Sequence, residues 1–293
     1  MTDPKPRFGV IGGSGLYDLP GAKVVAEVDP ETPWGKPSER VTLVELGDQV
    51  VAFLPRHGRG HRILPSEVNS RANLCALKVL GVEEVIAFSA VGSLKEERKP
   101  LDFSVPAQII DRTRHRPDTY FGDGVVGHVA FADPFCSRAA AVLREVLKED
   151  QADGAEAEET LVCMEGPLFS TRAESELYRA LGAGLINMSA LPEAKLAREA
   201  ELCYALVCMV TDYDCWREEH DDVDIQMVLQ NLMRNADHAR SLLLKMLPRL
   251  AASERDCGCG RACENAIITA PEHRSAEASR RLRILLPRYF SEE

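Results

Sequence analysis

The feature that most restricts the fold of this chain is a regular alternation of short apolar segments with amphipathic ones. The apolar segments are rich in Val and Ile, and most are apolar throughout, as expected of strands buried on both faces of a sheet. The segments that predict strands are 7–12, 41–45, 50–54, 82–90, 107–111, 161–165, 185–188 and 204–211. Gly47 and Asp48 join the second to the third as a hairpin turn would. This order predicts an α/β fold with a mostly parallel or mixed sheet that helices cover on both faces.

The segments between these strands have the apolar spacing of helices, and most have a polar start or a glycine end. They are 66–80, 137–149, 171–181, 192–201 and 224–247. In the last segment a stripe at helical spacing predicts a helix packed on the sheet; it consists of Ile225, Val228, Leu229, Leu232 and Met233. The sequence has no internal repeat and no Pro- or Ser-rich linker. We therefore expect one domain over residues 1–250, with an appendage at 251–293.

Charge and hydropathy exclude several classes of function. The 293 residues carry 35 Lys and Arg against 46 Asp and Glu, a net charge of −11, which argues against a broad nucleic-acid footprint. The longest apolar segment, 203–210, is far shorter than the ~20 residues that cross a bilayer. Residues 1–7 are polar and carry two prolines, unlike a secretory signal. We expect a cytoplasmic protein without nucleic-acid or membrane partners.

The nine cysteines fall into two groups. Six are scattered among apolar residues, as reduced core thiols would be: Cys75, Cys136, Cys163, Cys203, Cys208 and Cys215. The other three, Cys257, Cys259 and Cys263, lie close together near the C-terminus. They could chelate zinc or form a redox-labile disulfide, but Cys-x-x-Cys pairs and a fourth ligand are missing. We favour three surface thiols without a ligand, and expect no metal site.

Three predicted strands end in groups that bind anions. The first runs into Gly12-Gly13-Ser14-Gly15, where backbone N–H groups and a hydroxyl could meet an anion, although neither the dinucleotide nor the P-loop pattern is complete. Another precedes a basic segment at 55–62, and a third ends in small and hydroxyl side chains at 88–93. The alternatives are a tight turn and a solvated basic loop. Together the three ends predict one phosphate site.

Two carboxylates follow the last apolar strand. In an extended chain Asp212 and Asp214 point to the same side. Burial and like charge should raise the pKa of one of them and leave an acid able to donate a proton near neutral pH. The alternative is a pair of ordinary loop acids.

Two further strand ends could complete a pocket. Phe169, in the segment 165–172, could stack on a planar ring, and Met188, in 187–189, could pack under a sugar. Core packing is the alternative for both.

Six motifs occur in the order found in the trimeric purine nucleoside phosphorylase family, and the chain most resembles the branch that acts on S-methyl-5′-thioadenosine. The motifs are Gly12-Gly13-Ser14-Gly15, Arg56-His57-Gly58-Arg59, Ser89-Ala90-Val91-Gly92-Ser93, Glu165-Gly166-Pro167, Asn187-Met188-Ser189 and Thr211-Asp212-Tyr213-Asp214-Cys215-Trp216. The resemblance covers nearly the whole chain. It implies a single α/β domain with a central mixed, partly barrel-like β-sheet flanked by helices, in which 251–293 completes the domain and a subunit interface.

The resemblance also implies an activity. The expected reaction is phosphate-dependent cleavage of the N-glycosidic bond of S-methyl-5′-thioadenosine, giving adenine and 5-methylthioribose 1-phosphate. The partners would be the nucleoside and inorganic phosphate, which is a co-substrate, with no cofactor, in a homotrimer. The alternative is a purine nucleoside phosphorylase that prefers inosine, guanosine, adenosine or methylthioinosine.

Site residues follow from the matched positions. Those implied to hold phosphate are Ser14, Arg56, His57, Ser89, Ala90 through its backbone N–H, and Ser189. Those implied to line the base and ribose are Phe169, Asn187 and Met188. Asp212 would face purine N7 and Asp214 the 6-amino group, whereas His61, His128 and Leu285 would surround the 5′-methylthio group. Because an unpaired buried acceptor is costly, Asp214 favours a 6-amino over a 6-oxo purine.

Two positions depart from the family pattern. Leu168 stands where many relatives have Arg, and Phe88 stands where a smaller or hydroxyl residue is expected. Both would affect details of the phosphate and base contacts more than the class of reaction.

Overall fold

The computed structural model describes residues 5–13, 16, 22–150, 158–217 and 225–290. The strands are β1 (Phe8–Gly12), β2 (Lys23–Val28), β3 (Val41–Leu46), β4 (Gln49–Pro55), β5 (Glu84–Ser93), β6 (Phe103–Ser104), β7 (Gln108–Arg112), β8 (Thr160–Met164), β9 (Leu185–Asn187) and β10 (Cys203–Asp212). The α-helices are α1 (Ser70–Val79), α2 (Ser137–Asp150), α3 (Arg172–Ala180), α4 (Ala190–Glu199), α5 (Ile225–Ala252) and α6 (Ala276–Leu285). Short 3₁₀ turns are η1 (Pro65–Glu67), η2 (Gly258–Arg261) and η3 (Pro271–His273).

The strands form one mixed sheet in the order β2-β3-β4-β1-β5-β9-β8-β7, with β10 paired to β5 and β6 paired to β10. The predicted single-domain α/β fold with a mixed sheet is confirmed, as is the β3–β4 hairpin, in which Leu46 pairs with Gln49. Strands β4, β1, β5 and β10 are parallel neighbours. Their carboxyl ends therefore meet at one edge of the sheet, where α/β proteins place their sites.

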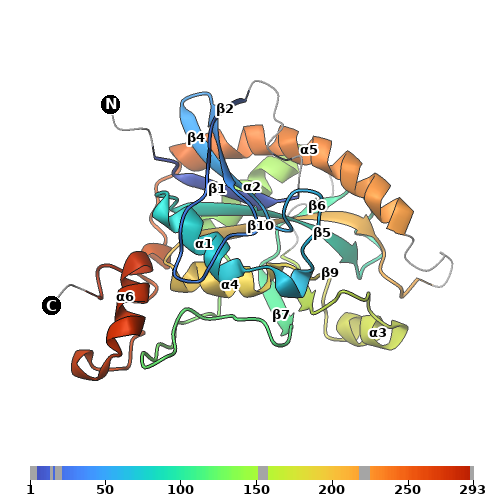
Figure 1. The fold of residues 1–293 in the computed structure, drawn as a ribbon. Helices are drawn as coiled ribbons and strands as arrows, with labels where there is room; N and C mark the ends of the chain where they lie inside the picture. Colours follow the sequence, from blue (N-terminus) through green and yellow to red (C-terminus); the bar gives the residue numbers. More distant parts are fainter. Residues whose placement is uncertain (1–4, 14–15, 17–21, 151–157, 218–224, 291–293) are drawn as a thin grey trace.

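Helices cover both faces of the sheet (Figure 1). On one face α1 and α4 pack together, and α6 packs on α1; on the other, α2 and α5 pack on each other and on β10. The core is divided accordingly. One cluster joins the sheet to α1, α4 and α6, and a second joins it to α2 and α5.

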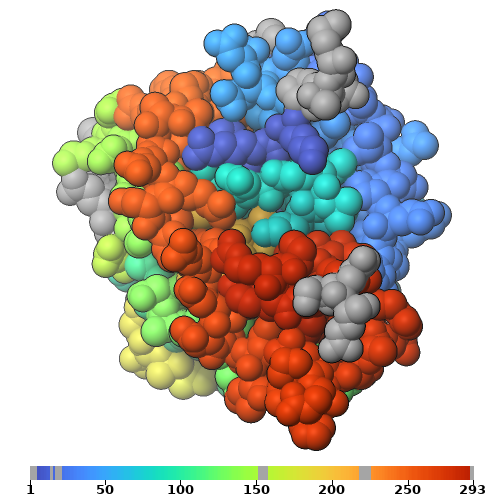
Figure 2. All heavy atoms as spheres, turned by 90° about the vertical axis from the view of Figure 1, so that its left-hand side faces the viewer, coloured from blue at the N-terminus to red at the C-terminus, as the bar shows by residue number. Residues whose placement is uncertain are grey.

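The C-terminal segment is part of this architecture. Its helix α6 contributes Leu282 and Leu285 to the first core cluster, and Cys259 in η2 belongs to the second. In Figure 2 the orange and red residues of this segment lie against the blue and teal N-terminal half. None of the helices within the described ranges is long and apolar enough to cross a membrane.

Helix α5 departs from its prediction. The apolar stripe expected to pack on the sheet leaves Leu229 and Met233 on the surface of this chain, 51% and 64% exposed. The side chain of Ile225 lies outside the described residues. The helix is held mainly by its second half, where Leu242, Leu243 and Met246 are fully buried, whereas Leu232 in the first half packs against the second core cluster. The prediction was therefore wrong for Leu229 and Met233, because periodicity identifies an apolar face but not what covers it.

The prediction of three surface thiols is also wrong. Cys259 and Cys263 are 5% and 1% exposed, and Cys257 is partly buried. All nine cysteines are free thiols in the structure.

Candidate active site

The candidate site lies where strand β5 changes its neighbour. One edge of β5 pairs with β10 from Glu84 to Gly92. The other edge pairs with β1 only as far as Ala87, and with β9 only from Gly92 onward. Among the described residues no strand covers positions 88–91 on that edge. This opening, at the carboxyl ends of the parallel strands, exposes backbone groups of β5 to a ligand.

Asp212 and Asp214 stand beside this opening. Asp212 ends β10 opposite Gly92, after a β-bulge that follows Val210. Oδ1 of Asp212 accepts a hydrogen bond from the backbone N–H of Asp214 at 2.9 Å, so the two acids are held together by the backbone. Asp214 has φ 52°, a left-handed conformation that Asp and Asn tolerate better than most residues.

The second oxygen of Asp212 contacts a hydroxyl. Its Oδ2 accepts a hydrogen bond from the Thr211 hydroxyl at 2.6 Å, and the same hydroxyl lies 3.2 Å from the backbone oxygen of Val91. The contact with Thr211 stabilises the ionised carboxylate and therefore lowers the pKa of Asp212.

Burial acts in the opposite direction. Desolvation raises the pKa of Asp212, although the contacts with Thr211 and with the Asp214 N–H lower it. Burial is also the main cause that raises the pKa of Asp214 to about 6; the Ser175 hydroxyl lowers it and the charge of Asp212 raises it. Oδ2 of Asp214 is buried and has no hydrogen-bond partner. Such an acceptor is costly in the free protein and suits a donor on a ligand.

Gly92 allows the acids to approach β5 this closely. A β-carbon at this position would lie 3.0 Å from Oδ1 of Asp212 and 3.4 Å from the β-carbon of Asp214. Even alanine would therefore displace the carboxylates.

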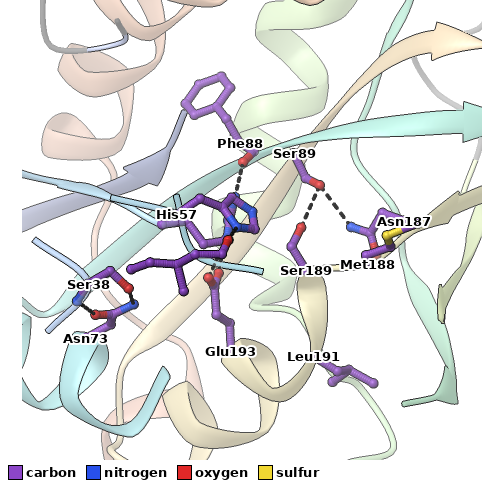
Figure 3. Close-up of polar contacts among 12 residues, drawn as sticks. Ser38, His57, Asn73, Phe88, Ser89, Asn187, Met188, Ser189, Leu191 and Glu193 are labelled. Carbon is purple, nitrogen blue, oxygen red and sulfur yellow. Dashed lines mark hydrogen bonds and ion pairs between the residues drawn. The ribbon is translucent and has the colours of Figure 1, made fainter. Parts of the chain in front are cut away.

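The hydroxyl and amide side chains expected at the site form one network across the opening (Figure 3). The Ser89 and Ser189 hydroxyl oxygens lie 2.8 Å apart, and Nδ2 of Asn187 donates to Ser89 Oγ at 3.0 Å. Antiparallel pairing of Gly92 with Ile186 explains this, since it places Ser189 opposite Ser89. Oδ1 of Asn187 is buried without a partner. The network leaves an acceptor and two rotatable hydroxyls for a ligand.

Arg56 reaches the opening from the end of β4, but it is already paired. Its Nε and Nη2 donate to both carboxylate oxygens of Glu193, at 2.5 and 3.0 Å, and its Nη1 donates to the backbone oxygen of Phe88 at 2.7 Å. Tyr204 donates to the same carboxylate at 2.9 Å. Burial lowers the pKa of Arg56, and Glu193 raises it by more. Three of five guanidinium N–H groups are used, so two remain.

His57 is fixed as a neutral ring. Its Nδ1 lies 2.9 Å from the backbone oxygen of Ile63 and therefore carries the hydrogen. Burial, followed by the charge of Arg56, lowers its pKa to about 4. Nε2 is then an acceptor, which suits the hydroxyl of a singly protonated phosphate.

The shift at His57 predicts a pH dependence of stability. Because the pKa of His57 in the folded protein lies below the ordinary histidine value of 6.5, the unfolded chain binds more protons between about pH 4 and 6.5. The free energy of unfolding should rise with pH in this window by about 2 to 3 kcal/mol through His57. Urea titrations of wild type and His57→Gln at pH 5 and 7.5 measure the difference. An exposed control, His273→Gln, should keep the wild-type slope; an unchanged slope in His57→Gln contradicts the prediction.

Other expected site residues are placed less centrally. Ser14 lies outside the described residues. His61 is exposed and stacks on His57, with ring centroids 4.4 Å apart. Phe169 is half-exposed and His128 is exposed. Leu285 is 1% exposed within the core of its own chain, so we omit it from the proposed site.

The basic segment does not act as one cationic cluster. Arg59 pairs with Glu27, and Arg62 pairs with Glu39 at 3.0 Å. These exposed ion pairs contribute little to stability but partly neutralise the segment. Only Arg56 and His57 turn toward the opening.

The two departures from the family pattern have little effect on the site. Phe88 is fully buried on the face opposite to Ser89, since neighbouring side chains of a strand alternate, and its ring points away from the serines in Figure 3. Only its backbone oxygen contacts Arg56. Leu168 is 82% exposed.

Arg116 is a positioning residue that sequence reasoning missed. This buried guanidinium donates to the backbone oxygens of Met188 and Glu165 at 2.7 and 2.6 Å, and its Nε donates to the Glu165 carboxylate at 3.0 Å. It thereby joins the two segments expected to line the nucleoside. It follows Arg112, Arg114 and His115, and this pattern is typical of a solvated basic loop. Nothing in the sequence indicates which arginine turns inward.

Replacing Arg116 should therefore damage both stability and substrate binding. Arg116→Met leaves buried carbonyls and the Glu165 carboxylate without their donor, which should cost about 3 to 5 kcal/mol in the free energy of unfolding. Arg116→Lys keeps the charge but lacks the fork, so KM should rise even where the protein folds. Denaturant titration and steady-state kinetics measure these effects, with the exposed Arg280→Met as control. Wild-type values for both variants would refute the positioning role.

Comparison with known proteins gives consistent matches over the whole chain. A model of the phosphorylase superfamily matches residues 7–248. The chain is 50% identical to the S-methyl-5′-thioadenosine phosphorylase of Koribacter versatilis over 98% of both chains. It is 47% identical to the same enzyme of Neurospora crassa, over 99% of this chain and 97% of that one.

Solved structures agree. A methylthioadenosine phosphorylase from an antarctic soil metagenomic library superposes with a TM-score of 0.90 at 46% identity, over 96% of this chain and 99% of the other. A variant of the adenosine/methylthioadenosine phosphorylase of Schistosoma mansoni, in complex with methylthioadenosine, has a TM-score of 0.80 at 35% identity, over 92% and 99%.

Proposed function

The chain belongs to the phosphorylase superfamily, and we propose that its reaction is that of its S-methyl-5′-thioadenosine phosphorylase relatives. It is a pentosyltransferase: inorganic phosphate cleaves the N-glycosidic bond of S-methyl-5′-thioadenosine, giving adenine and 5-methylthioribose 1-phosphate. The observation within the molecule that carries this function is the pair of acids beside the opening in β5, the buried Asp212 and the partly buried Asp214. The pair offers a proton donor and a hydrogen-bond acceptor to one edge of a planar base.

The leaving base needs a proton. Phosphorolysis passes through an oxocarbenium-like sugar, while negative charge develops on the departing purine. Asp212, whose pKa is raised by burial, is suited to protonate N7. Asp214, with its unpaired buried oxygen, is suited to accept from the 6-amino group.

Phosphate would occupy the hydroxyl network below the sugar. Ser89 and Ser189 would turn their hydroxyls from each other to the phosphate, and Arg56 would use its two remaining N–H groups. The backbone N–H and C=O groups of successive residues in a strand point to alternate edges, so those of Ala90 point to the same edge as those of Phe88. No described strand covers this edge of β5 at positions 88–91. This supports the Ala90 N–H as a phosphate donor. A dianion held beneath the sugar both stabilises the cation and attacks it.

The nucleoside would lie between the acids and the 164–169 and 187–189 segments. Arg116 holds the backbone of Met188, whose side chain would pack under the sugar, and Phe169 would stack on the base. His61 and His128 would complete the 5′ end. Gly166, at φ 71°, leaves room for Met188, since a β-carbon there would lie 2.4 Å from its Sδ.

A comparison of substrates tests the function. Release of adenine from S-methyl-5′-thioadenosine should require phosphate and should exceed the phosphorolysis of adenosine and inosine in kcat/KM. The sugar product should be 5-methylthioribose 1-phosphate. Faster turnover of inosine would assign the chain to the other base preference, and adenine release without phosphate would make it a hydrolase.

Assembly and location belong to the proposal as well. A homotrimer is supported by apolar side chains on the surface of the chain, Leu168, Phe169, Leu229 and Met233, and sedimentation would measure it. Residues 251–293 would complete the 1–250 domain and its interface. Nine unpaired thiols support a cytoplasmic location. The reaction uses phosphate as co-substrate and no organic cofactor.

A further inference from the structure

Four thiols from three distant segments converge at the end of the sheet opposite to Asp212. Cys136 precedes α2, Cys203 is the first residue of β10, and Cys257 and Cys259 stand at the start of η2. Their sulfur atoms all lie within 4.8 Å of one another, and those of Cys203 and Cys257 are 3.3 Å apart. Two of the four were expected to be isolated core thiols, and two to be surface thiols.

The spacing of these sulfur atoms is close to that of a metal site. Tetrahedral zinc with Zn–S bonds of about 2.3 Å requires sulfur atoms about 3.8 Å apart. Small rotations about the Cα–Cβ bonds therefore suffice to close the site. The backbone is already fixed, since the N–H of Cys136 donates to Tyr204 at 2.8 Å and that of Cys203 donates to Glu83 at 3.0 Å.

Two arginines supply the surroundings that such a site needs. Nε of Arg255 donates to the Cys203 sulfur at 3.4 Å. The guanidinium of Arg138 lies beside Cys203 and Cys257, is paired with Glu84, and has a buried Nε without a partner. Four thiolates around one divalent ion carry two net negative charges. The two arginines, which also pair with Glu84 and Glu83, place N–H donors beside the sulfur atoms.

We propose that Cys136, Cys203, Cys257 and Cys259 bind one zinc ion in a structural site that fixes the C-terminal segment to the sheet. Four sulfur donors leave no open position for a substrate, which is typical of structural and not catalytic zinc. The site is separated from Asp212 by the ten residues of β10, about 30 Å. Binding releases the protons of the four thiols. The sequence hid the site because the tail supplies two ligands, and the core supplies the other two.

Metal analysis of the full-length protein tests this proposal. The protein is expressed with zinc in the medium, purified with a phosphine reductant and dialysed against metal-free buffer. Wild type should retain about one zinc per chain. Cys136→Ser and Cys259→Ser should retain close to none. Cys263→Ser is the matched control, because Cys263 is buried in the same segment but donates to Glu199, outside the group, and should retain the wild-type amount.

Cobalt gives a second measurement that needs no variant. Wild type refolded or grown with Co²⁺ should show thiolate charge-transfer bands and the strong visible bands of a tetrahedral ion. Because these spectra need only the wild-type protein, they test the site even where a serine variant does not fold. Metal content and spectra are measured without turnover, so their outcome is independent of the proposed reaction.

Several results would overturn the zinc site. If wild type contains no zinc and all nine thiols can be titrated, the four cysteines are reduced thiols packed in the core. If wild type contains no zinc and two or four of the nine thiols cannot be titrated under non-reducing conditions, the four cysteines form disulfides. Iron in place of zinc would assign a redox centre, and zinc retained by Cys259→Ser would place the metal elsewhere.

Discussion

Asp212→Asn should lower kcat for S-methyl-5′-thioadenosine by about 10² to 10⁴-fold, the usual contribution of a general acid. Asparagine has the same shape, can still accept from the Asp214 N–H through its Oδ1, and can still contact Thr211. It cannot deliver a proton to N7. The fold and KM should therefore change little, and the loss should lie in kcat, as steady-state kinetics and denaturant titration will show.

A substrate analogue separates this role from a structural one. An N7-methylated analogue already carries positive charge on the base and leaves without protonation. Wild type and Asp212→Asn should cleave it at rates within about tenfold of each other. The exposed Asp237→Asn serves as control and should behave as wild type with both substrates. Equal losses on both substrates would show that Asp212 positions the base and does not protonate it.

The sequence predicts elements well where burial alone decides them. Strands such as β5 and β10 are mostly apolar because both faces are covered, and such runs are visible without a structure. Strand β2 was missed because its side chains are mostly exposed at the edge of the sheet, and β6 because it has two residues. Helix α5 shows the opposite error: its apolar stripe predicted burial, but Leu229 and Met233 of that stripe are exposed on this chain.

The site was predictable as far as its residues are adjacent in sequence. Asp212 and Asp214 stand at the end of one strand, Ser89 lies within β5 and Ser189 follows β9, so their chemistry could be inferred from local pattern. The roles of Glu193 and Arg116 could not be inferred in this way, because their partners are backbone and side-chain groups far away in the sequence. For Glu193 one signal existed: it shares a helical face with Ala190 and Ala197, where an acid needs a partner.

The same limit explains the cysteines. Ligand spacing in sequence identifies zinc sites built from two local pairs. Here one local pair, Cys257 and Cys259, meets two thiols that β10 and α2 bring from the core. Only the pairing of the sheet reveals that these segments meet.

Asp214→Asn should change the preference for the base. In wild type the buried Oδ2 of Asp214 has no partner and can accept from a 6-amino group, whereas a 6-oxo group opposite it would leave two acceptors face to face. Asparagine retains the left-handed backbone at this position and offers an NH₂ donor to a 6-oxo group. The ratio of kcat/KM for methylthioadenosine to that for methylthioinosine should fall by about 100-fold or more, since each unpaired buried group costs about 1 to 3 kcal/mol.

The same substitution has a consequence for stability that does not depend on substrate. The pKa of Asp214 in the folded protein, about 6, lies above the ordinary aspartate value of 3.8, mainly through burial. The folded state therefore binds more protons between about pH 4 and 6, and wild type loses stability as pH rises through this window. Asp214→Asn removes that loss and should be more stable than wild type at pH 8 by about 2 kcal/mol, but not at pH 4. Asp237→Asn should show neither effect.

The two measurements on Asp214→Asn together decide its role. If stability rises at high pH and the kcat/KM ratio of methylthioadenosine to methylthioinosine does not change, Asp214 is buried but does not contact the base. A changed ratio would place the 6-substituent against Oδ2 of Asp214.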